Sequence, residues 1–101
     1  MNPISEDCKA NYWLSCILLK EGSKVSPMDI ILALEKENIE SRPIWKPMHL
    51  QPVYCHNDFI TAETSGNVCE DIFNRGVCLP SDIKMTEEDI QRVIRIIKGL
   101  F

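Results

Sequence analysis

The side chains best suited to chemistry are concentrated in one stretch, SRPIWKPMHLQPVY, from Ser41 to Tyr54. Three of the chain's six prolines fall in it and hold the residues before them in extended conformations. Such a loop has little conformational entropy left to lose when a ligand binds. One interpretation is therefore a preformed loop that faces an anionic, hydroxyl-rich ligand with the polar groups of Lys46, His49 and Gln51 and with the flat apolar wall of Trp45.

A plainer interpretation of the same stretch stays open. Trp45 and its apolar neighbours can be ordinary packing, and the prolines can simply shape a connection. Arg42, Lys46 and His49 would then be solvated. The residues of the loop favour neither interpretation, and a domain of this size offers little room to enclose a ligand by itself.

No other catalytic chemistry is indicated by motif. The histidines and cysteines lack the spacing of a zinc site, so no metal site is predicted. The sequence has no glycine-rich phosphate loop, no nucleophile elbow and no carboxylate pair outside its helical acids. Cysteines within regular elements are usually small apolar core residues, so we expect Cys16, Cys69 and Cys78 to be buried.

Length and composition predict one domain, spanning residues 1–101. The net charge of −4 gives no basic footprint for nucleic acid or for an anionic membrane surface, and the longest apolar run is too short to span a bilayer. Five cysteines, an odd number without a CxxC pair, favour a reducing, cytoplasmic location. We therefore expect no nucleic acid and no membrane among the partners.

The elements that must position the loop alternate between strands and helices. The run from Asn11 to Gly22 predicts a buried strand of about eight residues. Ser26 and Pro27 are typical of a helix start, and the helix is expected to run to about Asn38. Its expected buried face consists of Met28, Ile31, Leu32 and Leu34. An extended path then leads to Pro43.

The second half of the sequence predicts two more helices and a strand. A short helix is expected from Asn67 to Arg75, and a strand over VCLPS is ended by Pro80. Thr86 caps a final helix that closes near Lys98. Together these elements predict a two-layer α/β (α+β) domain, in which a small sheet is covered by about three helices.

Three blocks of this sequence resemble a known family. NYWLSCILL, ALEKENIESRPIWKPMHLQPVY and FNRGVCLPSDIKMTEEDIQRVIRIIK are similar, in order and spacing, to the C-terminal part of the DegT/StrS-type sugar-nucleotide aminotransferases. The resemblance covers Asn11 to Lys98. It implies the small domain of a fold-type I enzyme that uses pyridoxal phosphate to move an amino group, typically from glutamate, to a nucleotide-linked keto sugar for polysaccharide or glycan biosynthesis.

The resemblance also implies that the chain is incomplete. In that family the cofactor, the Schiff-base lysine and the phosphate cup belong to a large N-terminal domain that this sequence lacks, so no catalytic residue and no bound cofactor are expected here, and this fragment alone should be inactive. In the complete enzyme, a homodimer, the loop would approach the nucleotide-sugar substrate. His49 is the first candidate for the sugar or its phosphates, with Trp45, Lys46 and Gln51 lining the approach. Arg42 would pair with a phosphate, with the carboxylate of the amino donor, or with a structural acid.

A second function stays open beside the enzyme. A free-standing interaction or regulatory domain derived from the same family would expose the same residues, with Ile44, Trp45 and Val53 contacting a partner protein.

Overall fold

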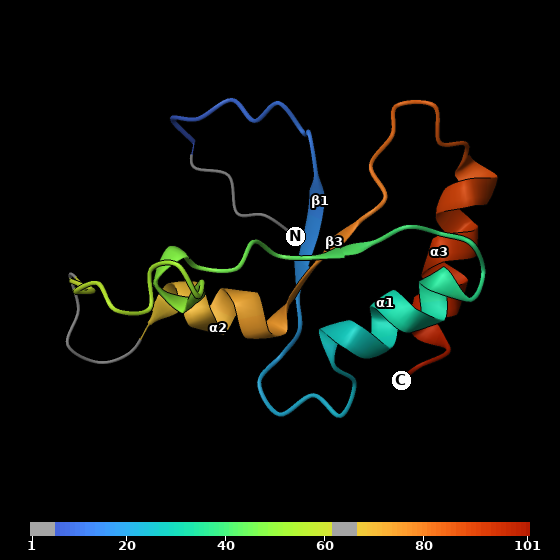
Figure 1. Ribbon diagram of the computed structural model, residues 1–101. Coiled ribbons are helices and arrows are strands. Elements are labelled where there is room, and N and C mark those ends of the chain that lie inside the picture. Colours follow the sequence, from blue (N-terminus) through green and yellow to red (C-terminus); the bar gives the residue numbers. More distant parts are fainter. Residues whose placement is uncertain (1–5, 62–66) are drawn as a thin grey trace.

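The computed structural model describes residues 6–61 and 67–101, which contain three α-helices and a three-stranded antiparallel sheet (Figure 1). This confirms the predicted α/β fold class. The elements are β1 (Ser15–Leu18), α1 (Pro27–Glu35), β2 (Arg42–Pro43), the 3-10 turn η1 (Met48–Leu50), α2 (Val68–Arg75), β3 (Gly76–Leu79) and α3 (Glu87–Lys98).

The last strand in sequence is the central strand of the sheet. The strand order is β1-β3-β2, and both outer strands run antiparallel to β3. Cys16 of β1 and Arg42 of β2 lie on opposite sides of the same β3 residue, Cys78. Pro43 has no N–H to donate, and an edge strand such as β2 tolerates it. Helices α1 and α3 lie together on one side of the sheet, whereas α2 lies on the other (Figure 1).

Reciprocal capping boxes begin both helices of the α1–α3 layer. The Ser26 hydroxyl accepts the Asp29 N–H and the Asp29 carboxylate accepts the Ser26 N–H, and Thr86 and Asp89 repeat the arrangement at α3. The predicted starts of both helices and the end of α3 at Lys98 are confirmed. Helix α1 ends at Glu35, earlier than expected, because the chain turns into the left-handed region at Asn38 with a φ of 57°.

The core lies between the sheet and the α1–α3 layer. Ile30, Leu34 and Val77 are fully buried, and Val93 of α3 joins them. The expected apolar face of α1 was wrong in part, because Met28 is 54% and Leu32 is 47% exposed. Residues 30 and 34 stand one turn apart and face the sheet, which turns residues 28 and 32 toward solvent.

Two further expectations about burial were wrong. The aromatic start of the predicted first strand is exposed, since Tyr12 has a positive φ of 54° and the strand begins only at Ser15. Cys69 is also exposed because it faces outward in the first turn of α2, whereas Cys78 is buried and Cys16 half-buried as strand residues.

Helix α2 and strand β3 are joined without a connecting residue, and glycine makes this possible. Gly76 is the first residue of β3 and directly follows Arg75, the last of α2. A Cβ at this position would overlap the Ile44 side chain and approach the Ile72 carbonyl oxygen to 2.5 Å. The absent side chain therefore sets how closely α2 and the segment after β2 approach β3.

Candidate functional site

The predicted binding loop is locally ordered and runs alongside α2 (Figure 1). Successive turns are closed by backbone hydrogen bonds from Leu50 N to Pro47 O (3.1 Å), from Gln51 N to Met48 O (3.0 Å) and from Tyr54 N to Gln51 O (2.9 Å). Two of the prolines stand within or beside these turns, which is consistent with a loop whose shape is set by its own sequence.

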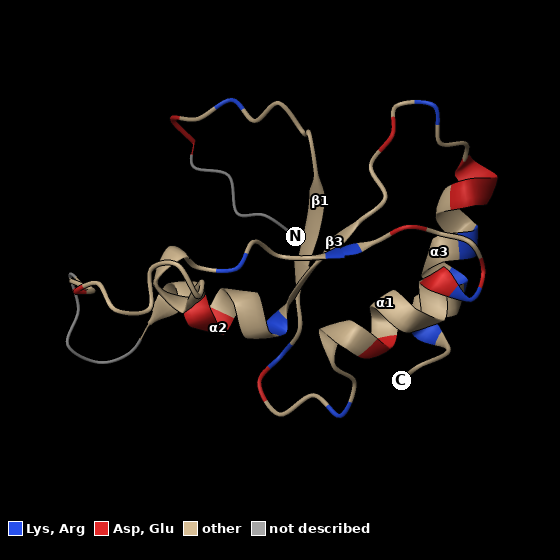
Figure 2. Ribbon diagram, viewed as in Figure 1, with Lys and Arg blue, Asp and Glu red and all other residues tan. Residues whose placement is uncertain are grey.

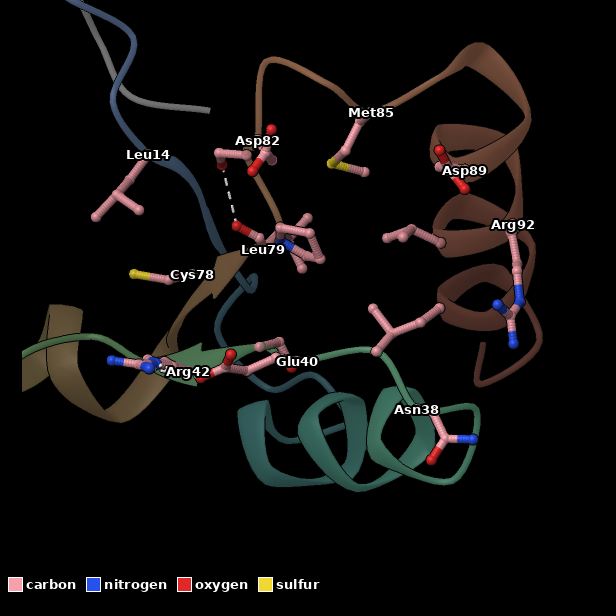
Figure 3. A pocket seen from close by; sticks show the side chains of 15 residues that line it. Leu14, Asn38, Glu40, Arg42, Cys78, Leu79, Asp82, Met85, Asp89 and Arg92 are labelled. Carbon is pink, nitrogen blue, oxygen red and sulfur yellow. Dashed lines mark hydrogen bonds and ion pairs between the residues drawn. The ribbon is translucent and has the colours of Figure 1, made fainter.

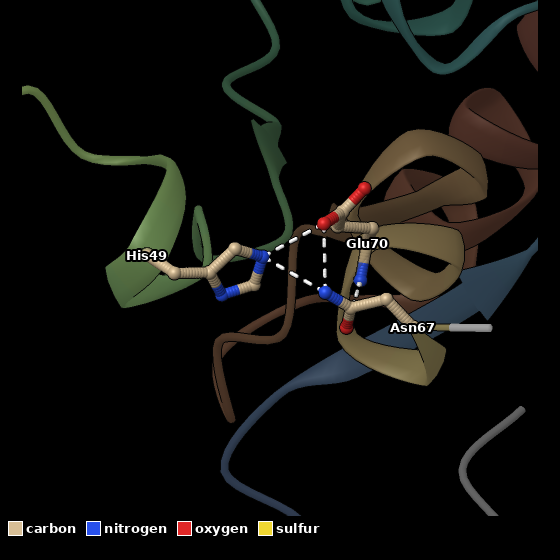
Figure 4. Close-up of polar contacts among 3 residues, drawn as sticks. All are labelled: His49, Asn67 and Glu70. Atoms are coloured by element: carbon tan, nitrogen blue, oxygen red, sulfur yellow. Dashed lines mark hydrogen bonds and ion pairs between the residues drawn. The ribbon is translucent and has the colours of Figure 1, made fainter. Parts of the chain in front are cut away.

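His49 is turned inward against the start of α2 (Figure 4). Its Nε2 lies 2.8 Å from Glu70 Oε1 and 2.8 Å from Asn67 Nδ2, and its ring stacks on Phe59 with centroids 3.7 Å apart. The His49 side chain is only 14% exposed. The expectation that this side chain points freely outward was wrong, because the capping residues of α2 hold it.

The contacts of His49 define which ring nitrogen carries a proton. The ionised Glu70 carboxylate can only accept a hydrogen bond, so its contact requires a proton on His49 Nε2. The Asn67 amide N–H can only donate, so its contact would require a lone pair on the same nitrogen. Asn67 Nδ2 also donates to Glu70 Oε1 (2.7 Å), and its Oδ1 accepts the Glu70 N–H (3.3 Å) as the helix cap. We therefore assign the Nε2–H tautomer, in which His49 Nε2 and Asn67 Nδ2 both donate to Glu70 Oε1. The other nitrogen, Nδ1, points away from both partners (Figure 4).

Arg75 fastens the other end of α2 to the sheet. It forms an ion pair with Asp71 one turn earlier, and its Nη1 donates to the Leu19 carbonyl oxygen (2.6 Å) just after β1. The hydrogen bond from the guanidinium lowers the pKa of Asp71 below its ordinary value. The helix that presents Asn67 and Glu70 is thereby fixed relative to the strands.

Trp45 belongs to a second, separate feature, which we call the tryptophan groove. It is an open hollow of about 610 Å³ lined by the segment before β1, by β2 and the segment after it, and by single residues of α2 and β3. Its lining includes Trp13, Trp45, Lys46, Phe73 and Cys78. The two indole rings, tilted by 45° with centroids 6.1 Å apart, are both about two-thirds exposed. They present a broad apolar surface to solvent.

Arg42 and Gln51 are engaged within the chain. Both Nε (2.8 Å) and Nη2 (2.5 Å) of Arg42 donate to Glu40 Oε1, in an ion pair that is mostly exposed. Arg42 borders the tryptophan groove and also a hollow of about 470 Å³ between β3 and α3 (Figure 3). The Gln51 amide turns back to donate to the Lys46 carbonyl oxygen (3.3 Å).

The structure thus divides the predicted residues into two groups. Arg42, Trp45 and Lys46 line the tryptophan groove, whereas His49 lies in a cluster with Asn67, Glu70 and Phe59. Sequence reasoning missed these three partners and also Trp13. The spacing of an Asn three residues before a Glu is a capping signal that could have indicated the α2 residues. Among the described residues, no group of three or more His, Cys, Asp or Glu side chains could hold a metal ion.

Comparison with known proteins identifies the family. Residues 1–98 match the DegT/DnrJ/EryC1/StrS aminotransferase family. The chain belongs to this family. The relatives of this chain include EpsN of Bacillus subtilis, whose given name describes it as a pyridoxal phosphate-dependent aminotransferase. EpsN is 48% identical over 92 residues, which are 91% of this chain and 23% of EpsN.

Two GDP-perosamine synthases are also similar to this chain. The Caulobacter vibrioides protein is 36% identical over 86 residues, covering 82% of this chain and 21% of that protein. The Vibrio cholerae protein is 30% identical over 91 residues, covering 90% of this chain and 24% of that protein. The chain therefore spans about a quarter of the length of the relatives it matches. In the described residues no helix combines the length and apolarity needed to cross a membrane.

The DegT/DnrJ/EryC1/StrS family depends on pyridoxal phosphate, and residues 6–61 and 67–101, which the structure describes, do not form a site for it. The cofactor needs an amine for its Schiff base, usually a desolvated one, but every lysine here is exposed. It also needs a cradle for its phosphate, commonly at a helix N-terminus. Each α-helix start in the described ranges is capped by the chain's own side chains and carries acids in its first turn, as Figure 2 shows for α3.

Proposed function

We propose that this chain is the C-terminal small domain of a larger pyridoxal phosphate-dependent aminotransferase. The complete enzyme, a homodimer, transfers an amino group from glutamate to a nucleotide-linked keto sugar that feeds polysaccharide or glycan biosynthesis. The family match over residues 1–98, together with relatives about four times as long, carries this proposal. Residues outside this chain hold the cofactor, and the chain by itself is inactive.

In this enzyme the loop from Ser41 to Tyr54 forms one wall of the substrate cleft. His49 contacts the sugar or its phosphates through Nδ1. The contact of its Nε2 with Glu70 Oε1 (2.8 Å) supports this role, because it fixes the orientation of the ring before the substrate arrives. Trp45 and Lys46 line the approach from the tryptophan groove, and Gln51 borders it. Arg42 exchanges its exposed partner Glu40 for a substrate anion, an exchange that costs little because exposed ion pairs are weak.

An exchange of domains with EpsN tests the proposed enzyme. The matching quarter of EpsN is replaced by this chain, with unaltered EpsN as the control. The chimera should show the visible absorbance of bound cofactor and should aminate at least one keto sugar from a panel linked to GDP, UDP or dTDP, with glutamate as donor. A folded chimera that binds the cofactor but converts no sugar of the panel would refute the sugar-nucleotide assignment.

The chain offers a matched control for His49. His56 is the other histidine, follows seven residues later and is exposed. In the chimera, His49→Ala should raise KM for the sugar nucleotide or lower kcat without changing cofactor absorbance, whereas His56→Ala should leave both unchanged. Equal kinetics for the two variants would remove His49 from the site.

The second candidate function is a free-standing interaction domain, which the exposed Trp13 and Trp45 rings favour. The two functions are separated by the DNA upstream of codon 1. An in-frame sequence encoding a cofactor domain supports the enzyme, whereas a ribosome-binding site at Met1 supports the interaction domain.

A further inference from the structure

A pair of thiols faces each other across the sheet beneath the tryptophan groove. Cys16 of β1 and Cys78 of β3 are direct register partners, and their Sγ atoms are 3.3 Å apart. Figure 3 shows Cys78 on β3 between Leu14 and Arg42. We propose that these two cysteines are a reversible oxidation site, which forms a cross-strand disulfide when a peroxide reaches Cys16.

The position of the pair in the ladder suits a disulfide. The hydrogen bond from Leu19 N to Arg75 O (2.9 Å) marks residues 19 and 75 as a hydrogen-bonded pair, so by alternation Cys16 and Cys78 form a non-hydrogen-bonded pair. At such pairs the Cα atoms are about 4.5 Å apart, which is within the range that a disulfide bridges. Only the two sulfurs have to approach each other, and the strands can keep their register.

The surroundings assign different roles to the two thiols. Cys16 is half-buried, whereas Cys78 is 7% exposed. Burial, together with the hydrogen bond to Cys16, raises the pKa of the Cys78 thiol to about 11. Cys78 therefore stays protonated at neutral pH, and of these two thiols Cys16 is the one that an oxidant reaches first. The other cysteines, Cys8, Cys55 and Cys69, are all exposed.

With a peroxide the proposed chemistry balances in two steps. The Cys16 sulfur attacks one peroxide oxygen and the O–O bond breaks, which leaves a sulfenic acid on Cys16 and releases water. The Cys78 sulfur then attacks the Cys16 sulfur. The S–S bond forms as the S–O bond breaks, and the hydroxyl leaves with the Cys78 proton as a second water. Two electrons pass from the thiols to the peroxide, and a dithiol reductant returns them.

Peptide mapping of the oxidised chain tests this site. The 101-residue chain is treated with hydrogen peroxide, its remaining thiols are alkylated, and it is digested with trypsin. We expect the peptide Ala10–Lys20 to be joined to the peptide Gly76–Lys84, with a mass two hydrogens below their sum, and the link to disappear after treatment with a dithiol. Predominant linkage through Cys8, Cys55 or Cys69 would overturn the proposal.

A second variant makes the result independent of the other thiols. Replacing Cys8, Cys55 and Cys69 by serine changes only exposed positions, so circular dichroism should match that of the unaltered chain. In this variant the link should form at least about tenfold faster in the folded chain than in urea, because folding holds the two sulfurs together. Equal rates in both states, or a sulfinic acid on Cys16 beside a free Cys78, would refute the inference.

Discussion

Replacing Gly76 by alanine should disturb the direct junction between α2 and β3. Gly76 has φ −96° and ψ 149°, which any residue adopts, so the effect comes from contact alone. The new Cβ would lie 2.5 Å from the Ile72 carbonyl oxygen, and ordinary contact at 3.4 Å requires the helix to retreat by about 0.9 Å. We expect a loss of about 1–3 kcal/mol in the free energy of unfolding. The retreat should also loosen the contact of Glu70 with His49.

Denaturant unfolding followed by circular dichroism measures this loss, and Gly99→Ala is the matched control. A Cβ at Gly99 meets nothing closer than 3.4 Å, and its φ of −69° is helical, so this variant should be unchanged or more stable by up to about 1 kcal/mol. Adding Ile44→Ala to Gly76→Ala should restore only part of the loss, because the contact with the Ile72 backbone remains. A Gly76→Ala chain as stable as the Gly99→Ala chain would refute the argument.

Three further predictions follow from features of the fold. Leu34→Ala should lower the free energy of unfolding by about 2–5 kcal/mol, whereas Leu32→Ala, at a position 47% exposed, should cost clearly less; similar losses would contradict the assigned core. Hydrogen bonds from Ser26 and Thr86 lower the pKa of Asp29 and Asp89 in the folded chain. The two carboxylates therefore stabilise the fold fully at pH values above their ordinary pKa of 3.8, and this stabilisation is lost as the pH falls below it. Thermal melts should show this loss of stability at low pH in the unaltered chain, and a smaller loss in the double variant Asp29→Asn/Asp89→Asn. In the EpsN chimera, Glu70→Gln should raise KM for the sugar nucleotide with unchanged cofactor absorbance, because the ring of His49 loses its carboxylate partner, and an unchanged KM would exclude Glu70 as a positioning residue.

The elements with strong local signals were predictable from sequence. Thr86, the acids that follow it and the isoleucine spacing specified α3 from its first to its last turn, because each signal acts within one helix. The buried face of α1 was harder to predict. Its sequence is apolar on nearly every side, so periodicity could not choose between Leu32 and Ile30, and only packing against the sheet decided in favour of Ile30.

The sequence singled out the loop as a candidate site, but the partners of its side chains could not be predicted. The prolines and polar groups of the loop marked the segment, and its ordered turns agree with that. The contact of His49 with Glu70 joins residues 21 positions apart, and no local pattern links them. Likewise, Trp13 was expected in a buried strand, and only the tertiary structure brings it to Trp45.

The strand order has a consequence for how the protein folds during synthesis. Neither β1 nor β2 has a strand partner until β3 is present, because β3 lies between them and is the last of the three in the chain. On the ribosome, residues 15–18 and 42–43 must therefore wait, with their hydrogen-bonding groups unpaired, until residues 76–79 have left the exit tunnel. The sheet forms late and in one cooperative step, and chaperones that bind extended apolar segments have their best opportunity at β1 during that interval.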